Sequence, residues 1–273
     1  MNKIKKALKA FGLILKRPYL LNHILNDESV HRDAVLKKYE QSKGLPVISM
    51  DAFFSGSEVS VEPYAYLSGA TMPTDLALLR LLAERFGAKR YFEIGTWRGE
   101  SVANVAAVVP ECVTLNLPRE EIVRLSGSEA YADLHGFFSR NLPNVRHIYG
   151  DSRTFDFAPY RSGFDLVFID GDHHYEAVKS DTASVLPLLR DGRSIIVWHD
   201  YAYDPETIRW SVLHGILDGL PLELHHRLFH VSNTMCAVLL PDEAAQTMPS
   251  TPLEPYQEPE HFFEVNLKLK YNK

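Results

Sequence analysis

The strongest constraint on this chain is a regular alternation of predicted strands and helices that begins near residue 73. Short apolar segments alternate with segments that have apolar residues at helical spacing, in the order 74–87 (helix), 90–95, 100–109 (helix), 112–117, 120–125 and 130–141 (helical pieces), 145–150, 164–170, 177–190 (helix) and 193–200. Segment 164–170 is almost continuously apolar, as expected of a strand buried on both faces. The alternation predicts an α/β fold with a parallel sheet between two helical layers.

The end of this region predicts a change of strand direction. A helix is expected within 206–219, a strand near 222–231 and a last strand at 235–241. Only Ser232, Asn233 and Thr234 separate the two strands, so they should form an antiparallel hairpin. We therefore predict a Rossmann-like, doubly wound, mostly parallel seven-stranded sheet over residues 63–240, with an N-terminal helical extension (1–62) and a C-terminal arm (241–273).

Both terminal regions have distinctive patterns. Residues 2–17 place apolar side chains on one side of a helix and lysines around them. Such a basic amphipathic helix suits contact with an anionic membrane surface, but packing on the protein body or on a second subunit is the commoner use of the pattern. The arm is rich in Pro and Glu up to residue 259, and 262–271 alternate like a strand. These extensions are compatible with a homodimer.

Composition excludes some functions. Lys and Arg total 29 against 35 Asp and Glu, for a net charge of −6, which argues against a nucleic-acid partner and favours a small molecule. No apolar run is long enough to span a membrane, and the N-terminus lacks a signal peptide, so a cytoplasmic location is expected. Cys112 and Cys236 lie in apolar runs and are expected to be reduced core thiols.

A glycine turn follows the first strand of the predicted sheet. Gly95 and Gly99 lie between that strand and the next helix, where open parallel sheets bind ligands. The third glycine of the dinucleotide-binding pattern is absent, which disfavours an NAD-dependent dehydrogenase. Taken alone, the two glycines also fit a simple tight turn.

Four motifs in a consistent order carry a family resemblance. They are EIGTWRGES at 93–101, GDS at 150–152, FDLVFIDGDHHYE at 164–176 and WHDY at 198–201. Over residues 70–240 the chain resembles the class I S-adenosylmethionine (SAM)-dependent methyltransferases, and among them the group related to catechol-type and macrolide-sugar O-methyltransferases. The resemblance implies an enzyme that methylates an oxygen of a small hydroxylated acceptor, sugar or polyketide-like.

The resemblance also implies a set of cofactor-binding residues. Glu93 is expected near the amino group of SAM, Ser101 near its carboxylate, and Asp151 near the adenine, although Asp151 could instead cap a turn. Asn116 stands where the family commonly has an acid for the ribose, and Glu120 or Glu121 is the alternative. The predicted cofactor-binding residues are Glu93, Gly95, Thr96, Gly99, Ser101, Asn116, Asp151, Ser152 and Asp170.

The predicted chemistry lies at the ends of two neighbouring strands. Asp170 and the pair His199 and Asp200 should meet at one edge of the sheet, where they could hold a divalent metal such as Mg²⁺ or Mn²⁺ that lowers the pKa of an acceptor hydroxyl. His199 could alternatively act as a base. His173 is the other candidate base, against the simpler interpretation of a loop capped by Asp172. The predicted catalytic residues are Asp170, His173 and His199.

Two alternatives remain open at this stage. A histidine with two carboxylates could hold non-haem iron, as in the cephalosporin-hydroxylase group, which shares this methyltransferase-like fold. The substitution of Asn116 for an acid would also suit a non-catalytic nucleotide-binding scaffold. Methylation of RNA is disfavoured by the net charge.

Overall fold

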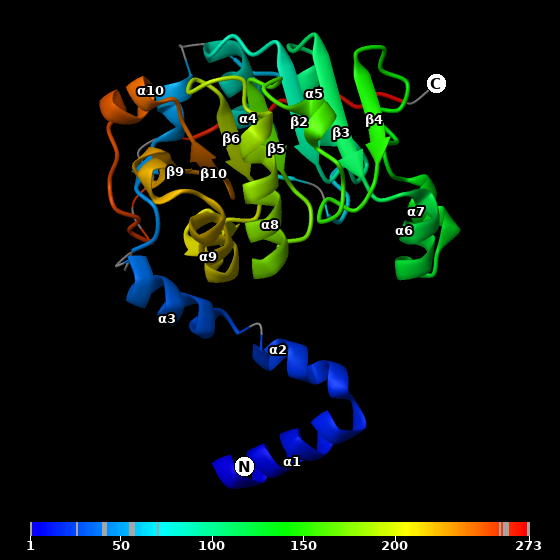
Figure 1. Ribbon diagram of the computed structural model, residues 1–273, viewed down its shortest axis with the longest axis vertical. Helices are drawn as coiled ribbons and strands as arrows, with labels where there is room; N and C mark the ends of the chain where they lie inside the picture. The colour runs from blue at the N-terminus through cyan, green and yellow to red at the C-terminus, as the bar shows by residue number, and fades with distance from the viewer. Residues whose placement is uncertain are drawn as a thin grey trace.

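A computed structural model describes residues 2–25, 27–39, 43–54, 58–69, 71–256, 258 and 262–271 of the chain. Eight strands form one sheet in the order β1-β9-β10-β6-β5-β2-β3-β4, and two short strands, β7 and β8, form a separate hairpin (Figure 1). The strands are β1 (Val47–Ile48), β2 (Arg90–Ile94), β3 (Glu111–Asn116), β4 (Val145–Tyr149), β5 (Leu166–Ile169), β6 (Ile195–Trp198), β7 (Ala202–Asp204), β8 (Thr207–Ile208), β9 (Leu228–Val231) and β10 (Ala237–Leu239).

The direction of the strands agrees with the sequence. β10 runs antiparallel to β6 and to β9, and the other pairs of the large sheet described here are parallel. The predicted Rossmann-like fold with an antiparallel hairpin at its end is therefore confirmed. The α-helices are α1 (Lys3–Lys16), α2 (Asn22–Leu25), α3 (Glu28–Tyr39), α4 (Pro73–Arg85), α5 (Glu100–Ala106), α6 (Arg119–Ser126), α7 (Glu129–Asp133), α8 (Tyr175–Val185), α9 (Trp210–Gly219) and α10 (Asp242–Thr247).

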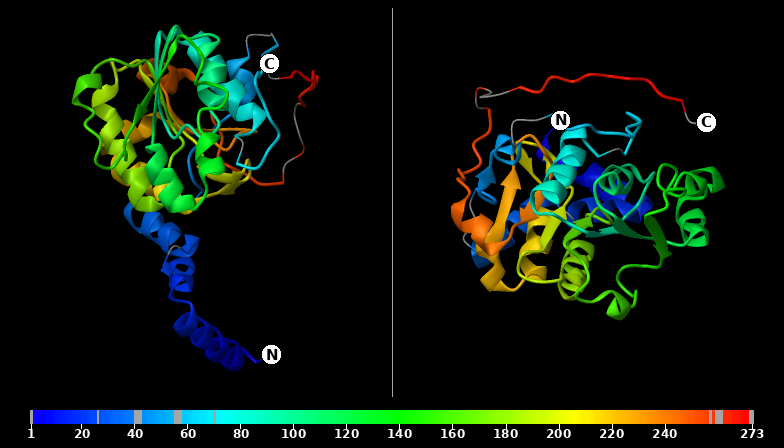
Figure 2. Two further views of the ribbon diagram at one scale, coloured as in Figure 1. Left: turned by 90° about the vertical axis from the view of Figure 1, so that its right-hand side faces the viewer. Right: turned by 90° about the horizontal axis from the view of Figure 1, so that it is seen from above.

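Helices cover both faces of the sheet (Figure 2). On one face, α3, α8 and α9 pack against apolar side chains of β2, β5 and β6, among them Ile94, Ile169 and Trp198. On the other face, α4 and α5 pack against Tyr91 and Phe168. This two-sided burial explains why β5 and β6 are apolar throughout. The sheet is thus a rigid support whose carboxyl edge can hold a site.

The sequence did not reveal the eighth strand. β1 comes from residues 43–54, within the range predicted as a helical extension, and pairs in parallel with β9 through Val47 and Ile48. A two-residue strand gives too short a pattern to be recognised. Thr251 of the C-terminal arm bridges to Val47 from the other side.

The remaining terminal segments extend from this body. α1 and α2 lead away from it, and α1 buries none of its residues (Figure 1). Residues 262–271 form no strand, in contrast to their alternating pattern, and Phe263 packs on Phe54 at a ring distance of 6.3 Å. Cys112 and Cys236 are buried free thiols, as predicted. In the described ranges, no helix is long and apolar enough to cross a bilayer.

Two isoleucines of the N-terminal region provide a matched test of this description. Ile48 in β1 is fully buried, whereas Ile4 in α1 is 67% exposed. Ile48→Ala should lower the free energy of unfolding by about 2–5 kcal/mol because it leaves a cavity in the core. Ile4→Ala should change it by less than about 0.5 kcal/mol. Urea denaturation measures both, and equal effects of the two substitutions would contradict the assignment of β1 to the core.

Candidate active site

The candidate site lies where the chain reverses its direction across the sheet. From β2 the chain proceeds through β3 and β4 to one side and returns to β5 and β6 on the other, so the ends of β2 and β5 form the switch point at which such sheets bind ligands. Gly95 follows β2 and Asp170 follows β5. A Cβ atom on Gly95 would lie 2.0 Å from the backbone oxygen of Asp170, and Gly95 has a φ of +93°. Only glycine fits there.

The turn after Gly95 is shaped by a second close contact. Gly99 has a φ of +78°, its N–H donates to the Thr96 carbonyl at 2.7 Å, and a Cβ atom on it would lie 2.2 Å from the Ser139 hydroxyl. α5 begins at the next residue. Thr96 is buried, and its hydroxyl lies 2.6 Å from that of Thr114 on β3. The two glycines are therefore required by the backbone of the turn.

Glu93 lies beneath this turn in the interior. Its carboxylate accepts hydrogen bonds from the Tyr91 hydroxyl at 2.6 Å and from the Thr114 hydroxyl at 2.9 Å, and Ser101 of α5 is a third partner. Burial raises the pKa of Glu93 to about 8, against these hydrogen bonds, which lower it. The structure thus places the predicted residues Glu93, Thr96 and Ser101 in one buried network under the glycine turn.

The end of β3 carries the residue that departs from the family pattern. The Asn116 amide nitrogen lies 2.8 Å from Nδ1 of His135, and His135 packs edge-on against Trp97 of the glycine turn. Asn116 therefore donates to the imidazole, which leaves its side-chain oxygen as an acceptor. Glu121, one of the two alternatives to Asn116, forms an ion pair with Arg124 at 2.7 Å.

A buried acid lies next to the loop after β4. Asp151 is partly exposed and pairs with Arg153 at 2.6 Å. Ser152 is a hydrogen-bond partner of Asp181, a buried residue of α8 whose pKa is raised by burial to about 6. Within the described structure, Oδ1 of Asp181 is buried without a hydrogen-bond partner. Asp181 was not among the predicted site residues, although an acid among the apolar core-facing positions of a helix was a usable signal.

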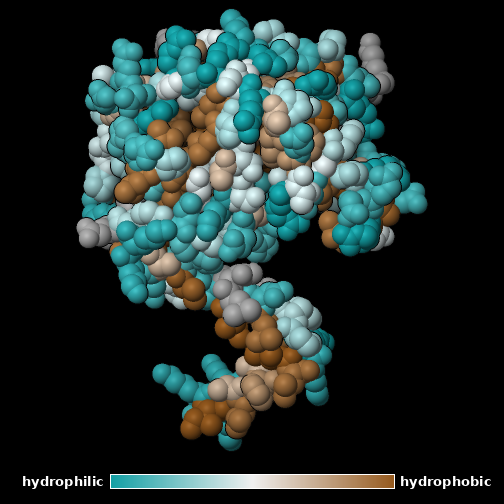
Figure 3. Space-filling model, viewed as in Figure 1, coloured by the Kyte–Doolittle hydropathy of each residue, from teal (hydrophilic) through white to brown (hydrophobic). Residues whose placement is uncertain are grey.

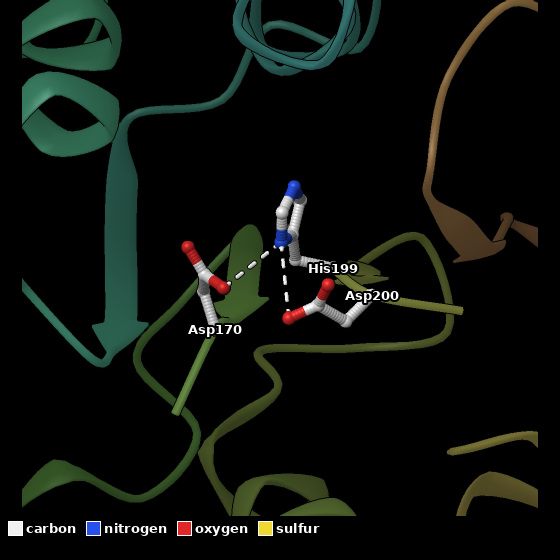
Figure 4. Close-up of side chains that lie close together, drawn as sticks. All are labelled: Asp170, His199 and Asp200. Atoms are coloured by element: carbon white, nitrogen blue, oxygen red, sulfur yellow. Dashed lines mark ion pairs between the residues drawn. The ribbon is translucent and has the colours of Figure 1, made fainter. Parts of the chain in front are cut away.

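The predicted metal ligands come together at the ends of β5 and β6. One side-chain atom each from Asp170, His199 and Asp200 lie within 4.8 Å of one another (Figure 4). Nδ1 of His199 lies 3.0 Å from Oδ1 of Asp170 and 3.6 Å from Oδ2 of Asp200. This nitrogen is buried, and neither contact has the geometry of a hydrogen bond. Asp200 adopts a φ of +57°, which turns its carboxylate back toward the other two residues.

Asp75 fixes the orientation of His199. Asp75 is fully buried, and its Oδ2 lies 3.1 Å from Nε2 of His199. A carboxylate can only accept, so Nε2 carries a proton and Nδ1 faces Asp170 and Asp200. The backbone N–H groups of Met72 and Met235 hold the Asp75 carboxylate from other sides, at 3.0 and 2.8 Å. Nothing local in the sequence links Asp75 to His199, 124 residues away.

The charges around His199 define two ways to satisfy Nδ1. Burial opposes its charge, but the carboxylates of Asp170, Asp200 and Asp75 together raise the pKa of His199 well above its usual value. A proton on Nδ1 is one solution. The other is a divalent cation bound by Nδ1 and by the carboxylates of Asp170 and Asp200. The Asp75 carboxylate would then accept the hydrogen bond from Nε2–H, which is the common arrangement of metal-binding histidines. The residues present fit a metal.

His173 has a different environment. Its side chain is about half exposed, and its Nδ1 lies 3.7 Å from Oδ2 of Asp200. Burial of part of the ring lowers the pKa of His173, so the neutral form that can accept a proton is favoured at neutral pH. Arg209 lies 3.3 Å from the other oxygen of Asp200. Of the two candidate bases, His173 is therefore the accessible one.

His173 also borders an open pocket of about 150 Å³. α3 of the N-terminal extension forms one side of it, and the loop after β5, the strand β7 and the start of α9 form the others. Its lining residues are Glu28, His31, His173, His174, Tyr175, Tyr203, Arg209 and Ser211. The Glu28 carboxylate accepts from the Ser211 hydroxyl at 2.7 Å, which fastens α3 to α9. Trp198 of β6 does not line this pocket. It is a core residue whose Nε1–H donates to the Thr182 hydroxyl.

Comparison with known proteins supports the class that the site indicates. Residues 92–201 match the family model of a methyltransferase domain. The match extends from β2 through the glycine turn to the end of β6, and therefore includes Asp170, His199 and Asp200. This match agrees with the class predicted from the sequence, the class I SAM-dependent methyltransferases.

More distant similarities involve single proteins. An uncharacterized protein of Acanthamoeba polyphaga mimivirus is 27% identical over 156 residues, and the match covers 51% of this chain and 66% of that protein. This chain thus spans slightly less than two thirds of that relative. Among solved structures, the Podospora anserina methyltransferase PaMTH1, bound to S-adenosylhomocysteine, has a TM-score of 0.44 and 18% identity over 63% of this chain and 80% of its own. An O-methyltransferase from Bacillus cereus has a TM-score of 0.43 and 19% identity over 64% and 84%.

The buried carboxyl group of Glu93 predicts a pH dependence of stability. Between pH 4.5 and about 8 the folded protein keeps a proton on Glu93 that the unfolded chain releases. Stability should therefore fall as the pH rises through this window, by at most about 1.4 kcal/mol per pH unit for one proton. Glu93→Gln removes this term, so its stability relative to wild type should increase from pH 4.5 to 8 in urea denaturation. The exposed substitution Glu120→Gln is the control. A constant difference between Glu93→Gln and wild type across this range would contradict the assignment.

Proposed function

We propose that the protein transfers a methyl group from SAM to an oxygen of a small hydroxylated acceptor, sugar or polyketide-like, with a divalent metal, Mg²⁺ or Mn²⁺, held by Asp170, His199 and Asp200. The observation that carries this proposal is the buried Nδ1 atom of His199. It faces two carboxylates at the switch point of a methyltransferase-type sheet, beside the glycine turn. Oxygen methylation requires an acceptor hydroxyl that loses its proton. A metal held by Asp170, His199 and Asp200 would make that loss easier by lowering the pKa of the hydroxyl.

The cofactor would occupy the crevice above β2, β3 and β4. Gly95, Gly99 and Ser101 would lie along its methionine end, and the network of Glu93 and Thr96 would hold that turn in place. The Asn116 side-chain oxygen would accept from a ribose hydroxyl. Asp151 would lie beside the adenine, and the unpartnered oxygen of Asp181 lies next to Ser152 in the same region. When bound, SAM supplies a methyl group on a positively charged sulfur.

The acceptor would lie in the pocket between α3 and the loop after β5. Tyr175 and Tyr203 offer ring faces there, and Glu28, His31 and Arg209 offer acceptors and donors for hydroxyl groups. A divalent cation, when bound, would bind the acceptor oxygen and lower its pKa. His173, between the pocket and Asp200, would take the hydroxyl proton at its imidazole. Arg209 would hold Asp200 in position.

Asp151 gives a direct test of the cofactor site. A substitution at Gly95 cannot serve as this test, because any side chain there would strike the backbone of Asp170 and disturb the fold. Asp151 pairs only with residues of its own loop, among the contacts described, so Asp151→Ala should leave the fold intact. We expect it to weaken SAM binding about tenfold, equivalent to about 1.4 kcal/mol, in calorimetry. Asp156→Ala, an exposed aspartate of the same loop, is the control. No SAM binding by the wild-type protein would favour the non-catalytic scaffold.

The metal site is tested by titration with Mn²⁺. Wild-type protein should bind one Mn²⁺, and Asp170→Asn should abolish that binding. Asp75→Asn should weaken it about 10–100-fold, because Asp75 orients His199 without binding the metal itself. Asp133→Asn, in a surface ion pair with Arg119, should have no effect. Retention of wild-type affinity in Asp170→Asn would contradict the site.

Asp170, His199 and Asp200 also fit a second candidate function, that of an iron-dependent hydroxylase. One histidine and two carboxylates could hold iron for oxygen activation, as in the hydroxylases that share this fold. Fe²⁺-dependent oxygen consumption without methyl transfer would favour that function. A homodimer and a cytoplasmic location remain predictions, which size measurement and localisation of the full chain would test.

A further inference from the structure

The N-terminal helix α1 carries an apolar face that none of the described residues covers. Ile4, Leu8, Phe11 and Leu15 lie on one side of the helix and are 67%, 68%, 62% and 69% exposed. α1 buries none of its residues and stands away from the body in two perpendicular views (Figures 1 and 2). Among the residues that the structure describes, α1 therefore lacks the packing on the body that is usual for such a helix.

The apolar surface continues beyond α1. After Pro18 the chain turns into a short 3₁₀ helix (Pro18–Leu21) and α2, where Tyr19, Leu21 and Ile24 are also exposed. The space-filling view shows hydrophobic surface along much of the projecting segment (Figure 3). A patch of this kind on a soluble domain marks an interaction surface.

The charge of the segment identifies its partner. Residues 2–25 contain six lysine and arginine residues and no aspartate or glutamate, although the whole chain has a net charge of −6. Among the described residues, none of these six forms an ion pair with the protein. The basic residues are Lys3, Lys5, Lys6, Lys9, Lys16 and Arg17.

We propose that α1 lies in the surface of a membrane that contains anionic lipids, with Ile4, Leu8, Phe11 and Leu15 among the acyl chains and the basic residues at the headgroups. With 14 residues, α1 is too short to span a bilayer, which requires about 20, so it would lie in the plane of the surface. Pairing with a second copy would also cover the apolar face, but it would bring the lysines of two helices close together. A membrane with anionic lipids would bury the apolar face of the helix and place negative charges next to its basic residues.

Vesicle flotation of the full-length protein tests this proposal. The protein should float with vesicles of phosphatidylcholine and phosphatidylserine in equal parts, but not with phosphatidylcholine alone, and added salt should weaken the binding. Leu8→Glu combined with Phe11→Glu should reduce the binding at least tenfold. Leu222→Glu, at an exposed leucine of the body, should not reduce it.

A charge-matched pair of variants tests the electrostatic part. Lys5→Glu with Lys9→Glu should reduce binding at least tenfold, whereas Lys37→Glu with Lys89→Glu changes the net charge equally and should leave it unchanged. Circular dichroism should show all variants folded, because α1 contributes nothing to the core. Absence of flotation, or equal binding by all variants, would overturn the proposal. A dimer that Leu8→Glu with Phe11→Glu dissociates, without vesicle binding, would assign the face to a second copy.

Discussion

The candidate site depends on the hydrogen bond between the buried carboxylate of Asp75 and Nε2 of His199. This bond commits the other imidazole nitrogen to the space between Asp170 and Asp200, where the strands β5 and β6 end. Asp75 can hold this position because α4 begins two residues earlier and because the backbone of Met235 donates to it from the hairpin. The start of α4, the end of β5 and the hairpin of β9 and β10 thus all contribute to the position of the His199 imidazole. Loss of Asp75 would leave a buried histidine facing carboxylates with no fixed orientation.

The closely packed backbone around Gly95 connects this site to the proposed cofactor crevice. Because Gly95 lies directly against the backbone of Asp170, the glycine turn and the first proposed metal ligand share one rigid contact. The network of Glu93, Thr114 and Thr96 supports the turn from below. Since β2 and β5 are adjacent strands, the sulfonium of SAM above the turn and an acceptor oxygen beside Asp170 would lie next to each other. Direct methyl transfer requires this proximity.

The sequence predicted the parts of this arrangement that follow from periodicity and strand ends. The alternation of strands and helices, the hairpin of β9 and β10, and the meeting of Asp170 with His199 and Asp200 all follow from parallel strands that end at one edge. It could not predict β1, whose two residues form no pattern. Asp75 and Asp181 were also missed, because their roles arise from contacts between distant segments. The N-terminal helix was recognised, but only the structure shows that none of the described residues covers its apolar face.

The measurement that tests the central claim most directly is a crystal structure of the full-length protein grown with S-adenosylhomocysteine and Mn²⁺, with anomalous diffraction to locate the metal. The account predicts the adenine beside Asp151, the homocysteine end along the glycine turn, and one manganese peak bound by Asp170, His199 and Asp200. A nucleoside bound elsewhere, or a crevice that stays without ligand while manganese lies outside these three residues, would contradict it.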